Sequence, residues 1–169
     1  GITWNSVQWI AAAITLGIGF GLQEVFANFV AGIILLFERP MRLGDYITIG
    51  ELSGRVTRIE MRATTIRDFS HKELVIPNKE FITGQFVNWT LSDNVVRISI
   101  PVGVAYGSDI ELVRSTLIDV AKADPRSLEE PPPQVVFLDF GASSLNFELR
   151  VHISGADEMV AIKSDFHFA

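Results

Sequence analysis

Three polar side chains, Gln23, Glu24 and Asn28, interrupt an otherwise apolar stretch near the start of the chain. Glu24 is the only formally charged residue between Trp9 and Phe37. Polar groups within an apolar helix are typical of a water-filled path through a membrane, where they face permeating ions. The same groups also suit a dinucleotide-binding turn or a buried helix, so the surrounding elements must decide between these three interpretations.

The glycines beside this cluster match a dinucleotide-binding turn only weakly. Gly17 and Gly19 follow a possible strand, and Glu38 lies about 20 residues further on, where a ribose-binding acid would stand. Leu22 occupies the third glycine position of that fingerprint, and no alternation of strands and helices follows. A soluble dinucleotide-binding enzyme therefore ranks third among the functions that this sequence could have.

The run from Trp9 to Phe37 predicts a membrane-spanning helix. A helix of that length measures roughly 43 Å at 1.5 Å per residue, more than the ~30 Å apolar core of a bilayer. It must tilt, bend or leave the membrane near Gln23 and Glu24, so that its second half lies along the interface. A domain of this size has too little surface to bury so long an apolar helix.

Small residues give this helix a face for close packing. Ala13, Gly17 and Gly21 recur every fourth residue, so they form a stripe on which a neighbouring helix can approach closely. Four glycines cost about 3 to 4 kcal/mol of helix propensity, which close packing must offset. Leu16 and Phe20 are also four apart. They either form apolar rings around an axis, which close a pore by excluding water, or face lipid and neighbouring helices.

Composition limits the partners and cofactors. The chain has 169 residues, 48% of them hydrophobic, and a net charge of −6, which gives no support for nucleic-acid binding. It has no cysteine, and His71, His152 and His167 are too scattered for a metal site. We expect no cofactor and no metal. Arginines follow the apolar run but none precede it, which predicts a cytoplasmic C-terminal side; they are Arg39, Arg42, Arg55 and Arg58.

The composition changes near Arg39-Pro40, which predicts a boundary between the helix (1–40) and two further domains. Short alternating segments with turn signals, one of them at Ser53-Gly54, predict a β-domain of about five strands over 41–92. From 93 to 169 the pattern predicts the order β-α-β-β-α, with Ser108 as N-cap of the first helix. That order is a split βαβ layer, ferredoxin-like, whose last strand is missing. We expect the chain to be a fragment truncated at both ends.

Motifs that resemble catalytic sites lack their partners. Asp139-Phe140-Gly141 copies a kinase triplet, but neither a glycine-rich loop with a following lysine nor a catalytic loop accompanies it. Ser143 and Ser144 have no plausible histidine partner. No catalytic residue is predicted, and we expect that the protein is not an enzyme.

Ordered motifs across the chain resemble those of the small-conductance mechanosensitive (MscS-like) channel family. They run from a glycine-rich helix ending at Gln23 through Asn28 and Gly32 to seven further segments: FERPMRLGD, GRV, ATTIRD, VIPN, NWTLSD, GVAYGSD and GASSLNFELRV. The GFGLQE variant is closer to the large, multi-helix MscK-type members than to the smallest one.

The resemblance implies a homoheptamer in the bacterial inner membrane. Its last transmembrane helix would line a pore, followed by an Sm-like β-domain and an α/β vestibule domain in the cytoplasm. Leu16 and Phe20 fall on the family's two constrictions, and Gly17, Gly19 and Gly21 on its packing stripe. Membrane lipid, other copies of the chain, ions and small solutes would be its partners.

One residue departs from the family pattern. Glu24 stands where the smallest member has a helix-bending glycine, so we expect the bend elsewhere, with Gly32 as the hinge. Glu24 either forms a carboxylate ring below the gate, favouring cations, or faces outward and pairs with a basic residue.

These patterns predict a channel opened by membrane tension, which releases ions and small osmolytes during hypo-osmotic shock. The alternative is a membrane-anchored binding module that conducts nothing.

Overall fold

The computed structural model describes residues 1 and 3–169, which form two compact units, Gly1–Asn88 and Trp89–Ala169. The predicted order of an apolar helix, a β-domain and an α+β domain is confirmed. The predicted boundaries at 40/41 and 92/93 stay predictions. The first unit joins a long helix to a five-stranded sheet, and the second joins a three-stranded sheet to two helices.

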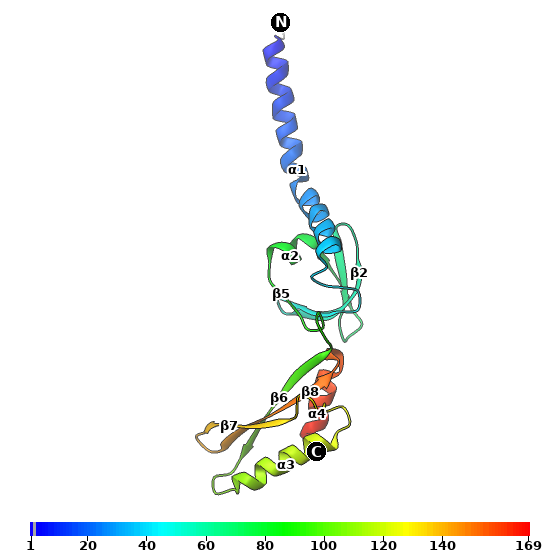
Figure 1. The fold of residues 1–169 in the computed structure, drawn as a ribbon. Coiled ribbons are helices and arrows are strands. Elements are labelled where there is room, and N and C mark those ends of the chain that lie inside the picture. Colours follow the sequence, from blue (N-terminus) through cyan, green and yellow to red (C-terminus); the bar gives the residue numbers. More distant parts are fainter. Residues whose placement is uncertain (2) are drawn as a thin grey trace. The chain divides into compact units, whose positions relative to one another are not determined.

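Helix α1 (Trp4–Glu38) is helical over its whole length. Thr3 begins it as N-cap, with its side chain accepting a hydrogen bond from the Ser6 N–H. Arg39 ends it in a left-handed conformation (φ 50°), and its N–H donates to the Leu35 carbonyl. Pro40 follows, and a proline cannot continue the helical hydrogen bonding. Figure 1 shows that only the C-terminal part of α1 lies beside the sheet.

The strands of the first unit form an antiparallel sheet in the order β4-β3-β2-β1-β5. Its elements are β1 (Tyr46–Ile49), β2 (Leu52–Ile59), β3 (Ala63–Arg67), β4 (Glu73–Pro77), α2 (Asn78–Thr83) and β5 (Phe86–Asn88). The core joins the end of α1 to the sheet, because Leu35 and Met41 are buried among Ile47, Val56 and Ile66. The predicted turn at Ser53-Gly54 is wrong. Both residues lie within β2, and Gly50 (φ 58°) makes the turn instead.

The second unit has the predicted order β6 (Val95–Val104), α3 (Ile110–Ala123), β7 (Gln134–Phe140), β8 (Leu145–Ser154) and α4 (Met159–Phe168), with a 3₁₀ turn at Ala156–Glu158. Its antiparallel sheet has the order β6-β8-β7. Buried and partly exposed residues alternate along β8, which is typical of a sheet with one face against helices. Asp109, not the predicted Ser108, is the N-cap of α3, because its carboxylate accepts from the N–H groups of Glu111 and Leu112.

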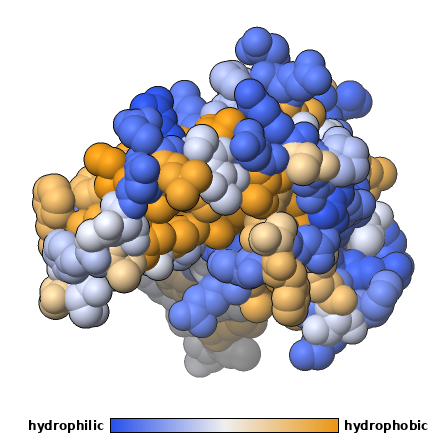
Figure 2. Space-filling view, turned by 90° about the horizontal axis from the view of Figure 1, so that it is seen from below, coloured by the Kyte–Doolittle hydropathy of each residue, from blue (hydrophilic) through white to orange (hydrophobic). Residues whose placement is uncertain are grey.

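Several large apolar side chains of the second unit stay exposed, including Leu112, Leu138 and Phe140. Figure 2, which views the molecule from below, shows apolar side chains gathered together with polar residues around them.

Candidate functional site

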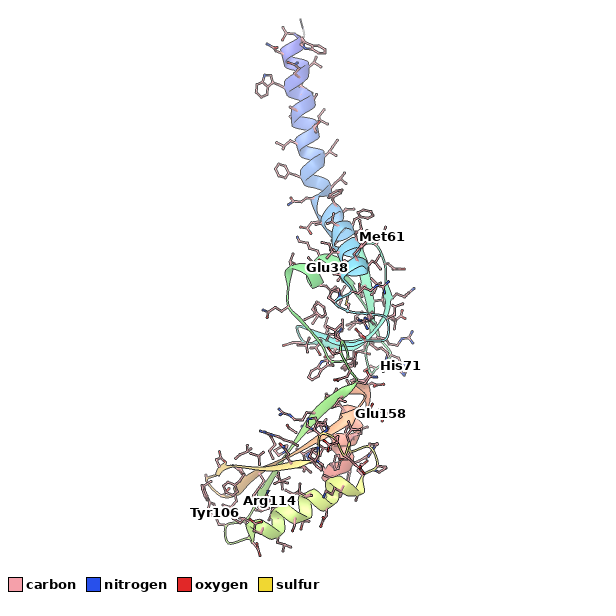
Figure 3. All side chains as sticks on the ribbon, in the orientation of Figure 1. Glu38, Met61, His71, Tyr106, Arg114 and Glu158 are labelled. Carbon is pink, nitrogen blue, oxygen red and sulfur yellow. The ribbon has the colours of Figure 1, made fainter. Side chains whose placement is uncertain are left out.

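The first part of α1 has no packing partner among the described residues. From Trp4 to about Gln23 its side chains are exposed and project outward (Figure 3). This part has about 20 residues and measures roughly 30 Å, the thickness of the apolar core of a bilayer. Trp4 and Trp9, typical of a membrane interface, stand near its start. By length and composition, α1 is long and apolar enough to cross a membrane.

Leu16 and Phe20 lie along one open groove of α1. They are 62% and 68% exposed, and Ala12, Thr15, Gly19 and Gln23 line the same groove. The two predicted gate residues are therefore side by side and free to meet other copies of the helix. Of the three polar candidates, Gln23 shares this groove.

The small residues lie on both sides of Leu16 and Phe20. At about 100° per residue, Gly17 and Gly19 point about 160° apart around α1, and Leu16 and Phe20 lie within about 20° of the midpoint between them. A helix in a ring has one neighbour on each side and one face toward the axis. Such a helix needs small residues on its two sides, where the neighbours pack closely, and can carry bulky apolar residues on the face between them. The two flanks belong to Gly17 with Ala13 and Gly21, and to Gly19 with Ala12.

No contact within one chain requires glycine at positions 17, 19 and 21 in the exposed part of α1. A Cβ atom added at Gly17, Gly19 or Gly21 would meet nothing within 4 Å. Three glycines in a helix cost about 3 kcal/mol relative to alanine. Contacts with another helix would offset that cost, which fits the predicted packing role.

Glu24 and Asn28 attach α1 to the β-domain. The Glu24 carboxylate lies 2.7 Å from the Lys79 Nζ, and the Asn28 Oδ1 accepts from the Lys79 backbone N–H at 2.9 Å. The Asn28 Nδ2 donates to the Glu24 carbonyl, one turn earlier. Glu24 was expected either to form a carboxylate ring below the gate or to pair with a basic residue. The contact with Lys79 corresponds to the second interpretation. Lys79, in the first turn of α2, binds both Glu24 and Asn28. Local sequence patterns could not predict this partner, because Lys79 stands 55 residues from Glu24.

At Gly32 the helix packs tightly against the β-domain. A Cβ there would overlap the Met61 carbonyl oxygen and lie 2.8 Å from the Asn78 Nδ2. The buried Asn78 side chain donates to the Glu60 carbonyl and accepts from the Thr64 hydroxyl. The absence of a side chain at Gly32 thus permits close packing. Its predicted role as a hinge stays a prediction, since α1 is helical through this position.

The motif that copies a kinase triplet has a structural explanation. The Asp139 carboxylate accepts from the Asn146 Nδ2 at 2.6 Å, and the Gly141 N–H donates to the Ser144 carbonyl. These contacts close the turn between β7 and β8. Over residues 1 and 3–169, no group of three His, Asp or Glu side chains is arranged as a metal site.

Two protein-family models match the chain. The mechanosensitive ion channel β-domain model matches residues 24–91, and the mechanosensitive ion channel MscS C-terminal model matches residues 98–169.

The chain is also similar to complete proteins and solved structures. It is 54% identical over 153 residues to the mechanosensitive channel MscK of Escherichia coli, covering 90% of this chain and 14% of that protein. It is 42% identical over 167 residues to the miniconductance mechanosensitive channel MscM of Escherichia coli, covering 99% of this chain and 15% of that protein. The closed-state crystal structure of Helicobacter pylori MscS superposes with a TM-score of 0.88 at 29% identity, covering 99% of this chain and 66% of that one.

The chain thus spans about one seventh of the length of the large channels that it matches. The two models together extend from the middle of α1 to the last residue. On this evidence the chain belongs to the MscS family of mechanosensitive ion channels.

Proposed function

We propose that this chain is the pore-forming part of a tension-gated ion channel that releases ions and small osmolytes during hypo-osmotic shock. The observation that carries the proposal is the exposed first part of α1. It is long enough to cross a bilayer, and it places Leu16 and Phe20 between two small-residue flanks. Both the sequence similarity and the matched family models support a channel.

The proposed pore is formed by several copies of α1, and we expect seven from the family. Rings of Leu16 and Phe20 exclude water from the axis and close the pore. If the open assembly occupies more membrane area, tension multiplied by that area difference shifts the population towards it. The cost of wetting the two rings opposes opening and sets the threshold.

The proposed location is the bacterial inner membrane with the β-domain and the second unit in the cytoplasm. Arg39, Arg42, Arg55 and Arg58 follow the apolar part of α1, and positive charge favours the cytoplasmic side.

A polar substitution in the ring tests the gate. Phe20→Ser in the full-length channel should lower the tension threshold or cause leakage at rest, because a hydroxyl lowers the cost of wetting. The measurement is single-channel current under suction in excised patches. Ile18→Ser is the matched control, since Ile18 is 56% exposed and points about 180° away from the Leu16–Phe20 face.

Two outcomes would contradict the proposal. Equal thresholds in the Phe20 and Ile18 variants would remove the gate assignment. An assembled protein that never conducts under tension would instead favour the membrane-anchored binding module.

A further inference from the structure

The Glu24 carboxylate has two basic side chains of the β-domain in its surroundings. The Lys79 Nζ lies 2.7 Å from it and forms the ion pair described above. Glu24 also lines an opening of about 260 Å³ between α1 and the start of β3, and Arg62 lines the same opening together with Asn28 and Ala63. One carboxylate of α1 therefore faces two cations and pairs with one of them.

The Arg62 guanidinium keeps its donors free. Among residues 1 and 3–169, no carboxylate forms an ion pair with this exposed side chain. Its backbone is held in place, because the Arg62 carbonyl accepts from the Asn78 N–H at 2.9 Å. The preceding residue, Met61, lies beside α1 (Figure 3), where its carbonyl leaves no space for a Cβ at Gly32. Arg62 is thus a second cation with a fixed backbone and a side chain free to change partner.

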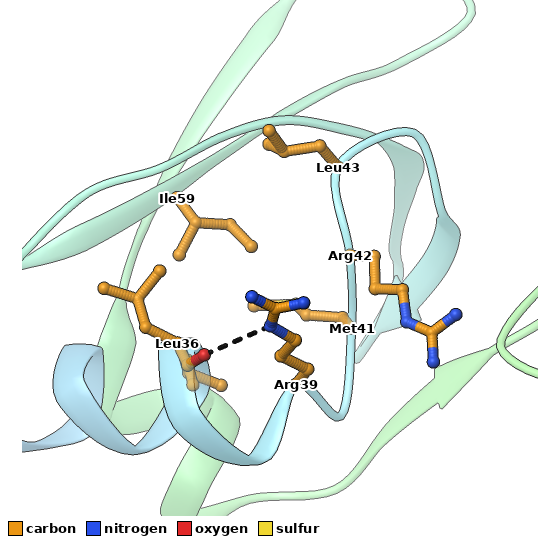
Figure 4. A pocket seen from close by; sticks show the side chains of 7 residues that line it. Leu36, Arg39, Met41, Arg42, Leu43 and Ile59 are labelled. Carbon is orange, nitrogen blue, oxygen red and sulfur yellow. Dashed lines mark hydrogen bonds between the residues drawn. The ribbon is translucent and has the colours of Figure 1, made fainter.

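The C-terminal end of α1 is packed, whereas Glu24 stands close to its exposed part. Leu35 is buried in the core, and the Arg39 Nε donates to the Leu36 carbonyl at the helix end (Figure 4). Glu24 is the outermost described position of α1 whose side chain bonds to the β-domain. It lies roughly 16 Å from Leu35 along the helix, so a tilt of about 10° around the packed end moves it by about 3 Å. Such a displacement is sufficient to break the contact with Lys79.

We propose that Arg62 is the second partner of Glu24, and that the carboxylate moves from Lys79 to Arg62 when α1 tilts on opening. This inference rests on the proposed function. Because one ion pair replaces another, the carboxylate has a partner in both states. The second pair stabilises the conducting state, since it keeps α1 attached to the β-domain after the first pair has broken.

Single-channel recordings of the full-length protein at a fixed tension separate the two partners. Lys79→Gln removes the closed-state pair and should raise the opening rate. Arg62→Gln should leave the opening rate unchanged and shorten the conducting dwell time about two- to fivefold, the size expected for an exposed ion pair. Arg67→Gln is the matched control, because Arg67 pairs with Glu73 on the same sheet, and both quantities should stay native.

Combined variants test whether Arg62 acts through Glu24. In a Glu24→Gln channel, the further change Arg62→Gln should have no effect on the dwell time. The reversed pair, Glu24→Lys with Lys79→Glu, should open at the native rate but close early, because a lysine at position 24 repels Arg62. Adding Arg62→Glu to the reversed pair should restore the long dwell time, since the conducting state then regains an opposite charge.

A native dwell time in Arg62→Gln would overturn the exchange. An equal shortening with and without the Glu24 carboxylate would also overturn it, because Arg62 would then act through another contact. Both results would leave the proposed function intact, since these variants still open under tension. A protein that never conducts would instead contradict the proposed function, and the exchange with it.

Discussion

At the scale of single residues, Lys79 is one of the positions at which α1 and the β-domain meet. Its side chain pairs with Glu24 and its backbone N–H pairs with Asn28, so one residue of α2 holds two successive turns of the helix. Both charged side chains are exposed, at 39% for Lys79 and 69% for Glu24. An exposed ion pair contributes about 0.2 to 1 kcal/mol and weakens as salt is added.

Removing the charge at Glu24 should loosen this contact. Glu24→Gln should increase hydrogen exchange of the α1 amides between residues 25 and 35 by about two- to fivefold at low salt. Mass spectrometry of the exchanged channel measures the change. The reversed pair, Glu24→Lys with Lys79→Glu, should restore protection, and high salt should reduce the difference. An equal loss in the reversed pair would show that the ion pair does not hold the helix.

A second residue-scale prediction concerns acid. Hydrogen bonds from the Arg126 side chain hold the pKa of Asp124 below its ordinary value, and a second contact joins Arg126 to Asp165 of α4. A carboxylate with a lowered folded-state pKa contributes stability above its unfolded value, about 3.9, and loses it as the pH falls through the lowered pKa. Asp124 therefore stabilises the second unit at neutral pH.

Asp124→Asn should destabilise the second unit by about 1 to 2 kcal/mol at pH 7. The difference from the native protein should begin to shrink below about pH 4, where the unfolded chain starts to bind this proton, and should be lost as the pH falls through the lowered folded-state pKa. Hydrogen exchange of α3 and α4, corrected for the intrinsic rate at each pH, measures this. Asp165→Asn is the control, with a smaller expected effect, because that carboxylate is 56% exposed. A difference that persists unchanged at pH 3 would contradict the assignment.

At the scale of elements, α1 contains glycines with two different environments. A Cβ atom added at Gly17 would meet open space within one chain, whereas a Cβ atom added at Gly32 would overlap the backbone of Met61 and crowd the Asn78 amide. The same substitution should therefore report on different contacts at the two positions.

Gly32→Ala should disrupt the packing of α1 on the β-domain, because its Cβ overlaps a backbone carbonyl that cannot move cheaply. We expect a loss of about 1 to 3 kcal/mol in local stability, seen as faster hydrogen exchange around Met61 and Asn78. Gly17→Ala should leave that exchange unchanged and alter the tension threshold instead, since its methyl group meets only a neighbouring helix. If Gly32→Ala left the exchange around Met61 unchanged, the close packing would be refuted.

Local sequence patterns predicted most elements and few of the contacts between them. Alternating apolar residues located the strands, and a run of apolar residues located α1. The six-residue helix α2 was not predicted, because so short a helix follows a strand with no periodicity of its own. The N-cap of α3 was placed one residue early, since Ser108 and Asp109 both suit that role. Contacts such as Glu24 with Lys79 depend on how the chain folds back and leave no trace in spacing.

At the scale of the whole molecule, the proposed pore exists only in an assembly. Native mass spectrometry of the full-length channel in detergent should give a single homo-oligomer, and seven copies are expected from the family. Gly17→Val and Gly19→Val should each weaken it, because each enlarges a different flank of the same helix. A monomeric full-length protein, or one in which both variants assemble normally, would contradict a pore lined by α1.

Because α1 is attached to the β-domain at Lys79, a rotation at this attachment moves the whole exposed part of α1. Its free arm is about 30 Å long, so a rotation of only 10° at the anchored end displaces the far tip by about 5 Å. Continuous helical hydrogen bonding makes this arm stiff, and little of the motion is lost along its length. In the proposed pore, small rearrangements at the anchored end of α1 would therefore become large displacements at its far tip.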